Sequence, residues 1–330
     1  MSEVYSTLTA LFTDIADAIR ETTGDTDLII ADDFPDVIRD SLQVKPYLTF
    51  KSPSSFTLKV NDTTKHWNGT LEYSTNASTW TIWDGTTTLS SATKGSSNVL
   101  YMRGTGNNVI CGNDINYRWV LTGNDIKCIG NIENLLDYAT VTAGNHPTMT
   151  ERCYQYMFDG CNALTQAPEL PATTLANYCY TQMFYGCTSL TQAPALPATT
   201  LTTYCYSHMF RDCTSLTKVP ALPWTTLAGH CCSHMFRGCT SLTQAPALQA
   251  TTLPSFCYAY MFQDCTSLKL SSTQTGEYTV EYRIPSSGTG TTGTNSNALI
   301  GMFASTGGTF KGTPSINTTY YLSNTNTVVS

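Results

Sequence analysis

The middle of the chain repeats every 26 residues, and this strict period constrains the fold more than any other feature. Five copies lie between residues 150 and 270. Several columns keep the same step in all five: Cys153, Cys179, Cys205, Cys231, Cys257; Cys161, Cys187, Cys213, Cys239, Cys265; Met157-Phe158, Met183-Phe184, Met209-Phe210, Met235-Phe236, Met261-Phe262; Leu164, Leu190, Leu216, Leu242, Leu268. Self-similarity at such a period indicates a solenoid, in which each repeat buries its apolar side against its neighbours.

Within one repeat, the pattern predicts two halves. Residues 190 to 201 contain proline and β-branched threonine, so they are predicted to be extended. In residues 202 to 213 the apolar positions fall at offsets near 1, 4, 5 and 8, which is typical of an inward-facing helical stripe formed by Tyr204, Cys205, Met209, Phe210 and Cys213. A glycine or aspartate before the last cysteine is predicted to end that helix. The sequence therefore predicts an α/β multi-domain protein whose centre is a leucine-rich-repeat solenoid of strand-helix repeats.

The repeats also resemble a known family. Segments such as CYTQMFYGCTSLTQAPALPATTL and CYSHMFRDCTSLTKVPALPWTTL are similar to the BspA-type leucine-rich repeats found in gut-bacterial and phage surface proteins. The resemblance covers about a third of the chain, residues 150 to 270. It implies the solenoid fold and, in function, adhesion or recognition. The chain departs from the pattern at Cys232, where the other repeats have tyrosine, and at Gln249, where they have proline.

Ten of the thirteen cysteines belong to the repeat columns, and three readings of them are open. Stacked coils would place equivalent thiols roughly 4.8 Å apart, as small buried side chains. Zinc would require closer Cys pairs or histidine partners at fixed offsets, and the eight-residue spacing does not favour it. Disulfides between neighbouring coils are geometrically conceivable. Packing is the preferred interpretation.

The sequence divides into four predicted regions. Residues 1–44 form a helical attachment or oligomerisation segment, with Leu8, Leu11, Phe12, Ile15 and Ile19 on one stripe. In residues 45–130 apolar and polar side chains alternate with a period of two, which predicts a small antiparallel β domain. Residues 131–270 form the leucine-rich-repeat solenoid, and residues 271–330 form a C-terminal cap with a Gly/Ser/Thr-rich loop. The β region contains four tryptophans, Trp67, Trp80, Trp83 and Trp119. Two or three of them are interpreted as core side chains and the rest as lying on the margin of the core, with a carbohydrate platform as the alternative.

The first region, TDIADAIRETTGDTDLIIADDFPDVIRDSL, resembles N-terminal segments of phage tail and other virion structural proteins. That resemblance implies attachment to the particle through other virion proteins. The N-terminus shows no secretory signal, and no stretch approaches 18 apolar residues. A protein made in the host cytoplasm and then carried on a virion satisfies both observations, so virion localisation is predicted.

Charge and motif content exclude several functions. The net charge is −7 and only 12% of residues are charged, which argues against nucleic acid or anionic membrane as a partner. None of the five histidines lies in a nucleophile elbow, an HExxH motif or a paired-carboxylate context. The sequence therefore predicts no enzyme activity, no cofactor and no metal site.

Binding is predicted from the positions that differ between repeats. One column reads Tyr, Gln, His, His, Tyr and another reads Asp, Tyr, Arg, Arg, Gln, and large side chains of these types anchor recognition surfaces. The alternative is sequence drift on a solvated face. The candidate recognition residues are Tyr156, Gln182, Tyr185, His208, Arg211, His234, Arg237 and Tyr260.

Three functional hypotheses follow. The first is a phage virion structural protein, a tail fibre or similar appendage, that recognises a host surface protein or glycan through its repeats. The second is a purely structural or decorating virion protein of the head or tail. The third is a bacterial surface adhesin. A fibre would also favour a homo-oligomer, specifically a trimer.

Overall fold

The computed structural model describes residues 45–62, 64–293 and 296–330. The chain divides into two compact units, Met1–Pro46 and Tyr47–Ser330, and the structure described below is that of the second. The predicted helical attachment segment, residues 1–44, lies outside the described residues.

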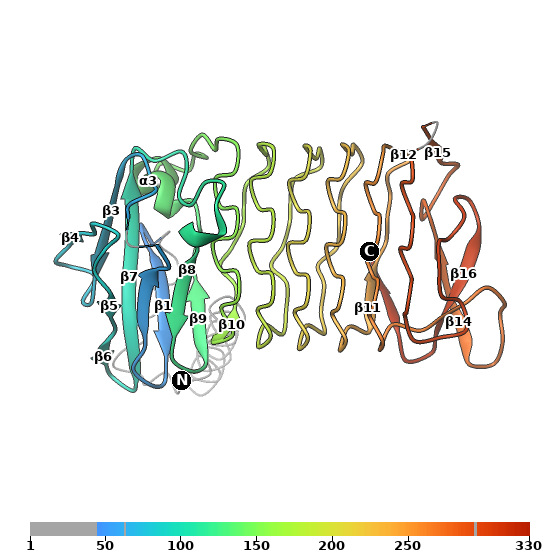
Figure 1. The fold of residues 1–330 in the computed structure, drawn as a ribbon, viewed down its shortest axis with the longest axis horizontal. Coiled ribbons are helices and arrows are strands. Elements are labelled where there is room, and N and C mark those ends of the chain that lie inside the picture. The colour runs from blue at the N-terminus through green and yellow to red at the C-terminus, as the bar shows by residue number, and fades with distance from the viewer. Residues whose placement is uncertain (1–44, 63, 294–295) are drawn as a thin grey trace, which may run out of the picture. The chain divides into compact units, whose positions relative to one another are not determined.

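The Tyr47–Ser330 unit begins with two β-sheets. Their strands are β1 (Leu48–Ser52), β2 (Thr57–Val60), β3 (Thr70–Ser74), β4 (Thr81–Ile82), β5 (Leu89–Ser90), β6 (Ala92–Lys94), β7 (Ser97–Thr105), β8 (Trp119–Thr122) and β9 (Ile126–Ile129), with a 3₁₀ turn at Ile115–Tyr117. The larger sheet has the order β10-β9-β1-β7-β3-β4, with β6 also paired to β7, and the smaller has the order β5-β2-β8. All pairs among β1 to β9 are antiparallel, and β10 (Leu164–Gln166) joins β9 in parallel (Figure 1).

Alternating burial explains this sheet region. In β1, Leu48, Phe50 and Ser52 are buried while Thr49 and Lys51 are partly exposed, as the two-residue period of a strand requires. Three of the four tryptophans of the region are buried: Trp67, Trp83 and Trp119 are at most 3% exposed. These three rings are core side chains, so they offer no face to a carbohydrate.

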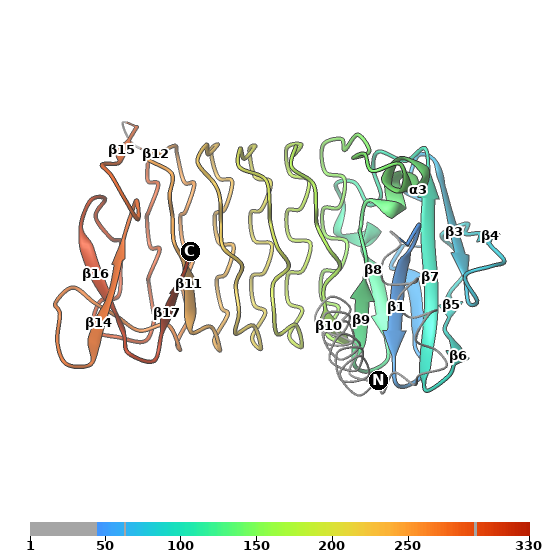
Figure 2. The same ribbon diagram turned by 180° about the vertical axis from the view of Figure 1, so that it is seen from behind.

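The predicted strand-helix leucine-rich-repeat solenoid is wrong. The described residues contain one α-helix, α3 (Asn134–Thr142), and it precedes the repeats instead of recurring within them. Most of the regular structure consists of small β-sheets, and the half of each repeat that was expected to be helical is a run of turns. Successive repeats lie side by side as coils of this turn structure (Figures 1 and 2).

The third coil shows how the turns are bonded. Within it, the N–H groups of Ser207, Met209 and Arg211 donate to the carbonyl three residues earlier, at 3.2, 3.2 and 3.1 Å. The residues between them donate to the next coil instead: the N–H groups of Tyr206, His208 and Phe210 bond to the carbonyls of Cys231, Ser233 and Met235, each at 2.9 Å. Backbone donors therefore alternate between the coil itself and its neighbour, whereas an α-helix uses every donor internally.

Every fourth residue of this segment has a positive φ angle. In the first coil these residues are Arg152, Tyr156 and Gly160, with φ of 60°, 63° and 71°. The resulting four-residue period sends pairs such as Cys153-Tyr154 and Met157-Phe158 inwards. Over only twelve residues, this period and the 3.6-residue period of a helix give almost the same apolar offsets, which is why the pattern predicted a helix. The glycine or aspartate before the last cysteine is the third positive-φ position and ends no helix.

The proline-containing half of each repeat forms little regular structure. It contributes β10, β11 (Gln244–Pro246) and β12 (Thr252–Leu253), together with isolated bridges Gln192 to Lys218 and Thr200 to Thr226. Proline has no N–H to donate, so a proline in each copy interrupts any ladder between neighbouring coils.

Aromatic side chains stack from coil to coil inside the repeats. The rings of Phe158, Phe184, Phe210, Phe236, Phe262 and Phe303 form one nearly parallel series with centroids 5.5 to 5.8 Å apart. A second series runs through Tyr154, Tyr180 and Tyr206. At its next position the chain has Cys232, and the indole of Trp224 takes the place of the missing phenol, stacking on Tyr206 at 5.4 Å. Trp224 stands where the other repeats have alanine, so the two departures compensate each other.

All thirteen cysteines are free and buried. In the second cysteine column the thiols of Cys187, Cys213, Cys239 and Cys265 donate to a phenylalanine carbonyl of the preceding coil at 3.0 to 3.1 Å. Burial raises the pKa of the Cys161 and Cys179 thiols to about 12. The columns are therefore packed thiols, the reading that the sequence favoured over disulfides and zinc.

The last part of the chain continues the coil and contributes strands to three small sheets. Residues 297 to 305 repeat the turn pattern, and the N–H groups of Tyr258 and Phe262 donate to Ala298 and Met302. The remaining strands are β13 (Leu270–Ser271), β14 (Tyr278–Arg283), β15 (Thr291–Thr292), β16 (Thr319–Ser323) and β17 (Thr327–Val329). The three sheets have the orders β13-β16-β14, β12-β15 and β11-β17. Strand β17 returns to pair with β11. The predicted domain boundaries at residues 130 and 270 stay a prediction. The β9–β10 pair joins strands on either side of residue 130, and the β11–β17 pair joins strands on either side of residue 270.

Candidate functional site

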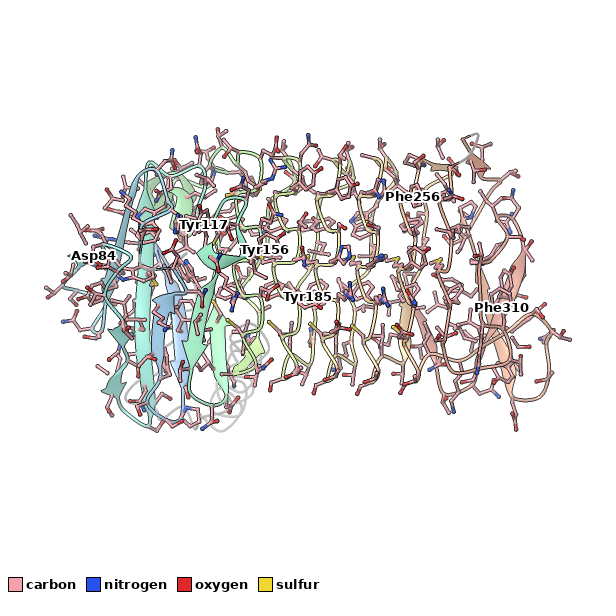
Figure 3. The ribbon with its side chains drawn as sticks, viewed as in Figure 1. Asp84, Tyr117, Tyr156, Tyr185, Phe256 and Phe310 are labelled. Carbon is pink, nitrogen blue, oxygen red and sulfur yellow. The ribbon has the colours of Figure 1, made fainter. Side chains whose placement is uncertain are left out.

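The two variable columns lie on one side of the turn coils, and we call them together the recognition face. Its members are Tyr156, Gln182, His208, His234 and Tyr260 in the first column, and Asp159, Tyr185, Arg211, Arg237 and Gln263 in the second. Figure 3 labels Tyr156 and Tyr185 among the side chains of the first coils. All are half-buried except Asp159, which is buried. The nine half-buried side chains therefore rest on their coils and still reach solvent.

The first column occupies backbone positions that favour glycine. The φ angles of Tyr156, Gln182, His208, His234 and Tyr260 lie between 55° and 63°. For a residue with a Cβ, this region costs about 1–2 kcal/mol. No copy uses glycine here, although three of five copies use it at the next positive-φ position, that of Gly160. Large polar and aromatic side chains are therefore kept at a recurring backbone cost.

Contacts along the first column are strongest in the third to fifth coils. The imidazoles of His208 and His234 pack edge to face with centroids 4.4 Å apart, and His234 lies 4.7 Å from the ring of Tyr260. Below them, the Ser207 hydroxyl contacts His208 Nδ1 and the Ser233 hydroxyl, each at 2.9 Å. These contacts fix the orientation of the first imidazole.

Both imidazoles are held neutral near pH 7. Burial lowers the pKa of His208 to about 4, with a smaller contribution from the nearby Arg211 and Arg237 guanidinium groups. Burial also lowers the pKa of His234 to about 3, followed by the effects of His208 and the same two arginines. The two histidines therefore act as neutral donors and acceptors beside two permanent positive charges.

The two arginines are each held by one aspartate. Arg211 Nε lies 3.4 Å from Asp212 Oδ2, and Arg237 Nε lies 3.3 Å from Asp264 Oδ2. The Arg211 guanidinium also lies over the Tyr185 ring, with Cζ 5.4 Å from the centroid. Asp212 and Asp264 share the third positive-φ position of their repeats, and the repeat between them has Gly238 there. The φ of Gly238 is 74°, and a Cβ at this residue would collide with the Asp212 carboxylate. The glycine therefore gives Asp212 the space it occupies.

Several polar atoms of the recognition face are buried without a hydrogen-bond partner. Within the described residues these include Asp159 Oδ2, Arg211 Nε, His234 Nδ1 and Gln263 Oε1. Arg211 Nε is close to Asp212 but is not aligned for a hydrogen bond. Burial raises the pKa of Asp159 to about 6. Unsatisfied groups of this kind cost free energy in the folded state, and a ligand that bonded to them would recover part of that cost.

A third column beside the recognition face was missed by sequence reasoning. Arg152, Tyr178, Tyr204, His230 and Phe256 all have positive φ, and the last four stack face to face at 4.6 to 4.7 Å. The Arg152 guanidinium caps the stack 4.5 Å from the Tyr178 ring. The helical interpretation directed Tyr204 inwards, but its ring is half-buried on the surface. The sequence did contain a signal for this column, because the residue just before the first cysteine of each repeat differs from copy to copy.

The described residues offer no grouping for a metal and no membrane span. No three His, Cys, Asp or Glu side chains in this part of the chain lie close enough together to bind a metal ion. Nor does any helix there have the length and apolar content needed to cross a membrane.

Comparison with known proteins adds no relative. No family model matches the sequence, and neither the curated proteins nor the solved structures contain a match.

Proposed function

We propose that this protein is a virion appendage, a tail fibre or similar structure, that recognises a host cell surface with its recognition face. The observation that carries the proposal is the retention of Tyr, His and Gln at five positive-φ positions where glycine would remove the backbone cost. In the missed column, face-to-face stacking offsets that cost by about 0.5–1.5 kcal/mol per pair.

Ring contacts offset the cost in only part of the first column. His208, His234 and Tyr260 make edge-to-face and tilted ring contacts, whereas Tyr156 and the ringless Gln182 make none along the column. Partly exposed Tyr, His and Arg side chains supported by a rigid coil are the types that anchor protein interfaces. A ligand that contacts these side chains supplies the compensation that coil packing leaves out.

The attachment role rests on the resemblance of residues 1–44 to virion proteins. A purely structural or decorating virion protein would carry the same coils without a ligand. A bacterial adhesin would carry the ligand without the particle. These two alternatives predict different results in the experiment below.

The test uses a triple variant, Tyr185→Ala/Arg211→Ala/Arg237→Ala. Fluorescently labelled full-length chain is mixed with a panel of gut-bacterial isolates, and bound protein is measured by flow cytometry. We expect the wild-type chain to bind at least one isolate and the triple variant to lose most of that binding, because the three side chains form the polar centre of the face.

The matched control is Lys218→Ala/Lys269→Ala, which removes the same net charge from exposed positions elsewhere on the repeats. It should bind like the wild type, and both variants should retain cooperative thermal unfolding. Binding that is absent from every isolate, or unchanged in the triple variant, would overturn the recognition role and favour the decorating protein. Failure to find the protein on purified particles would favour the adhesin.

A further inference from the structure

The two arginines of the recognition face each have an aspartate beside Nε. Only Arg237 Nε donates a hydrogen bond to its aspartate, Asp264, whereas Arg211 Nε lies 3.4 Å from Asp212 without bonding to it. In the described part of the chain neither guanidinium has a hydrogen-bond partner for its Nη atoms. Arg211 and Arg237 occupy the same position of neighbouring coils, which are separated by about the spacing of paired strands, 4.8 Å. The Nε hydrogen bond orients the Arg237 guanidinium, and the ion pair with Asp212 keeps the Arg211 guanidinium close to the coil, so both leave their Nη edges free for a second acceptor.

Resting on the proposed function, we infer that Arg211 and Arg237 together bind an anionic oxygen group, a carboxylate or a phosphate, carried by an acidic surface polysaccharide. Bidentate arginine pairs suit these planar or tetrahedral oxyanions better than neutral hydroxyls. The neighbouring Tyr185, His208, His234 and Gln263 supply neutral donors and acceptors for the sugar hydroxyls around the anion.

The electrostatic surroundings define what the site can accept. Asp212 and Asp264 balance the two arginines, so the site carries little net charge and attracts an anion through directed N–H donors. The Arg211 and Arg237 guanidinium groups both contribute to lowering the pKa values of His208 and His234, so the two positive charges lie near the imidazoles. His234 Nδ1 is a buried atom without a hydrogen-bond partner.

The experiment compares polymers that differ only in charge. Full-length protein is titrated by calorimetry with polygalacturonate, with its methyl ester, with phosphorylated dextran and with unmodified dextran. The variants are Arg211→Gln/Arg237→Gln and the control Lys218→Gln/Lys269→Gln. We expect an acidic polymer to bind at least about ten-fold more tightly than its neutral counterpart, and the arginine double variant to lose about ten-fold or more while the lysine control does not.

The two acidic polymers separate the carboxylate source from the phosphate source. Equal affinity for acidic and neutral polymers, no binding to either acidic polymer, or an unchanged arginine variant would overturn this inference. The proposed function would still stand if the Tyr185/Arg211/Arg237 triple variant lost binding to cells. If the arginine variant binds the acidic polymers like the wild type and the triple variant also binds cells like the wild type, the proposed function is rejected as well.

Discussion

Replacing Phe210 by alanine should lower the free energy of unfolding by about 3–5 kcal/mol. Phe210 is fully buried and lies in the middle of the phenylalanine series, 5.5 Å from Phe184 and 5.7 Å from Phe236. Its removal leaves a cavity between two rings that cannot close, because the backbone bonds between coils fix their spacing. Urea denaturation of the full-length chain, followed by fluorescence and circular dichroism, measures the change.

The matched comparison is Tyr204→Ala, in the half-buried aromatic stack of the missed column. It removes stacking contacts of 4.7 and 4.6 Å but creates no internal cavity, so a loss of about 1–2 kcal/mol is expected. Equal losses for the two substitutions would contradict the assignment of the phenylalanine series to the core and of the Tyr204 stack to the surface.

Acidification from pH 6.5 to pH 4 should remove about 4 kcal/mol of stability through His208 and His234. Their folded-state pKa values, about 4 and about 3, lie below the ordinary value of 6.5, so the folded protein binds their protons less readily than the unfolded chain. This stability is fully present above pH 6.5 and is lost as the pH falls towards 4 and 3. Each histidine contributes about 2 kcal/mol, after allowance for the part of each ring that water reaches.

The measurement is the difference in unfolding free energy between the wild type and His208→Gln/His234→Gln across this pH range. Asp159 contributes with the opposite sign, because its raised pKa of about 6 makes the folded state gain a proton first as the pH falls. Taking the difference between two chains that both contain Asp159 removes its contribution. Parallel pH profiles for the two chains would show that the imidazoles are not held neutral by burial.

The sequence predicted which residues of the repeats are buried better than it predicted their backbone. The cysteine, Met-Phe and leucine columns are core side chains as the repeat pattern indicated, because a periodic apolar position must be covered in any stacked arrangement. Helix and turn could not be separated, because Cys153, Tyr154, Met157 and Phe158 satisfy both periods. The alternation of backbone donors between coils depends on contacts 25 residues away, which a local pattern does not contain.

The candidate site was partly predictable, because positions that vary between repeats are the ones that the core does not constrain. Variation along the columns of His208 and Arg211 indicated that both columns turn outwards, and both side chains are half-buried in the structure. The column of Tyr178 and Tyr204 was missed because a helical stripe directs it inwards. The anchoring of Arg237 by Asp264 depends on neighbouring coils being in register, which follows only from the three-dimensional structure.

The most direct test of the turn structure is the stability difference between Gln182→Gly and Gln182→Ala. Gln182 has a φ of 55°, and its side chain makes no ring contact that would obscure the comparison. The turn coil predicts that the glycine variant is more stable than the alanine variant by about 1–2 kcal/mol, because only alanine is strained at positive φ. A strand-helix repeat predicts the opposite sign, with alanine more stable by about 1 kcal/mol, and that result would contradict the structure described here.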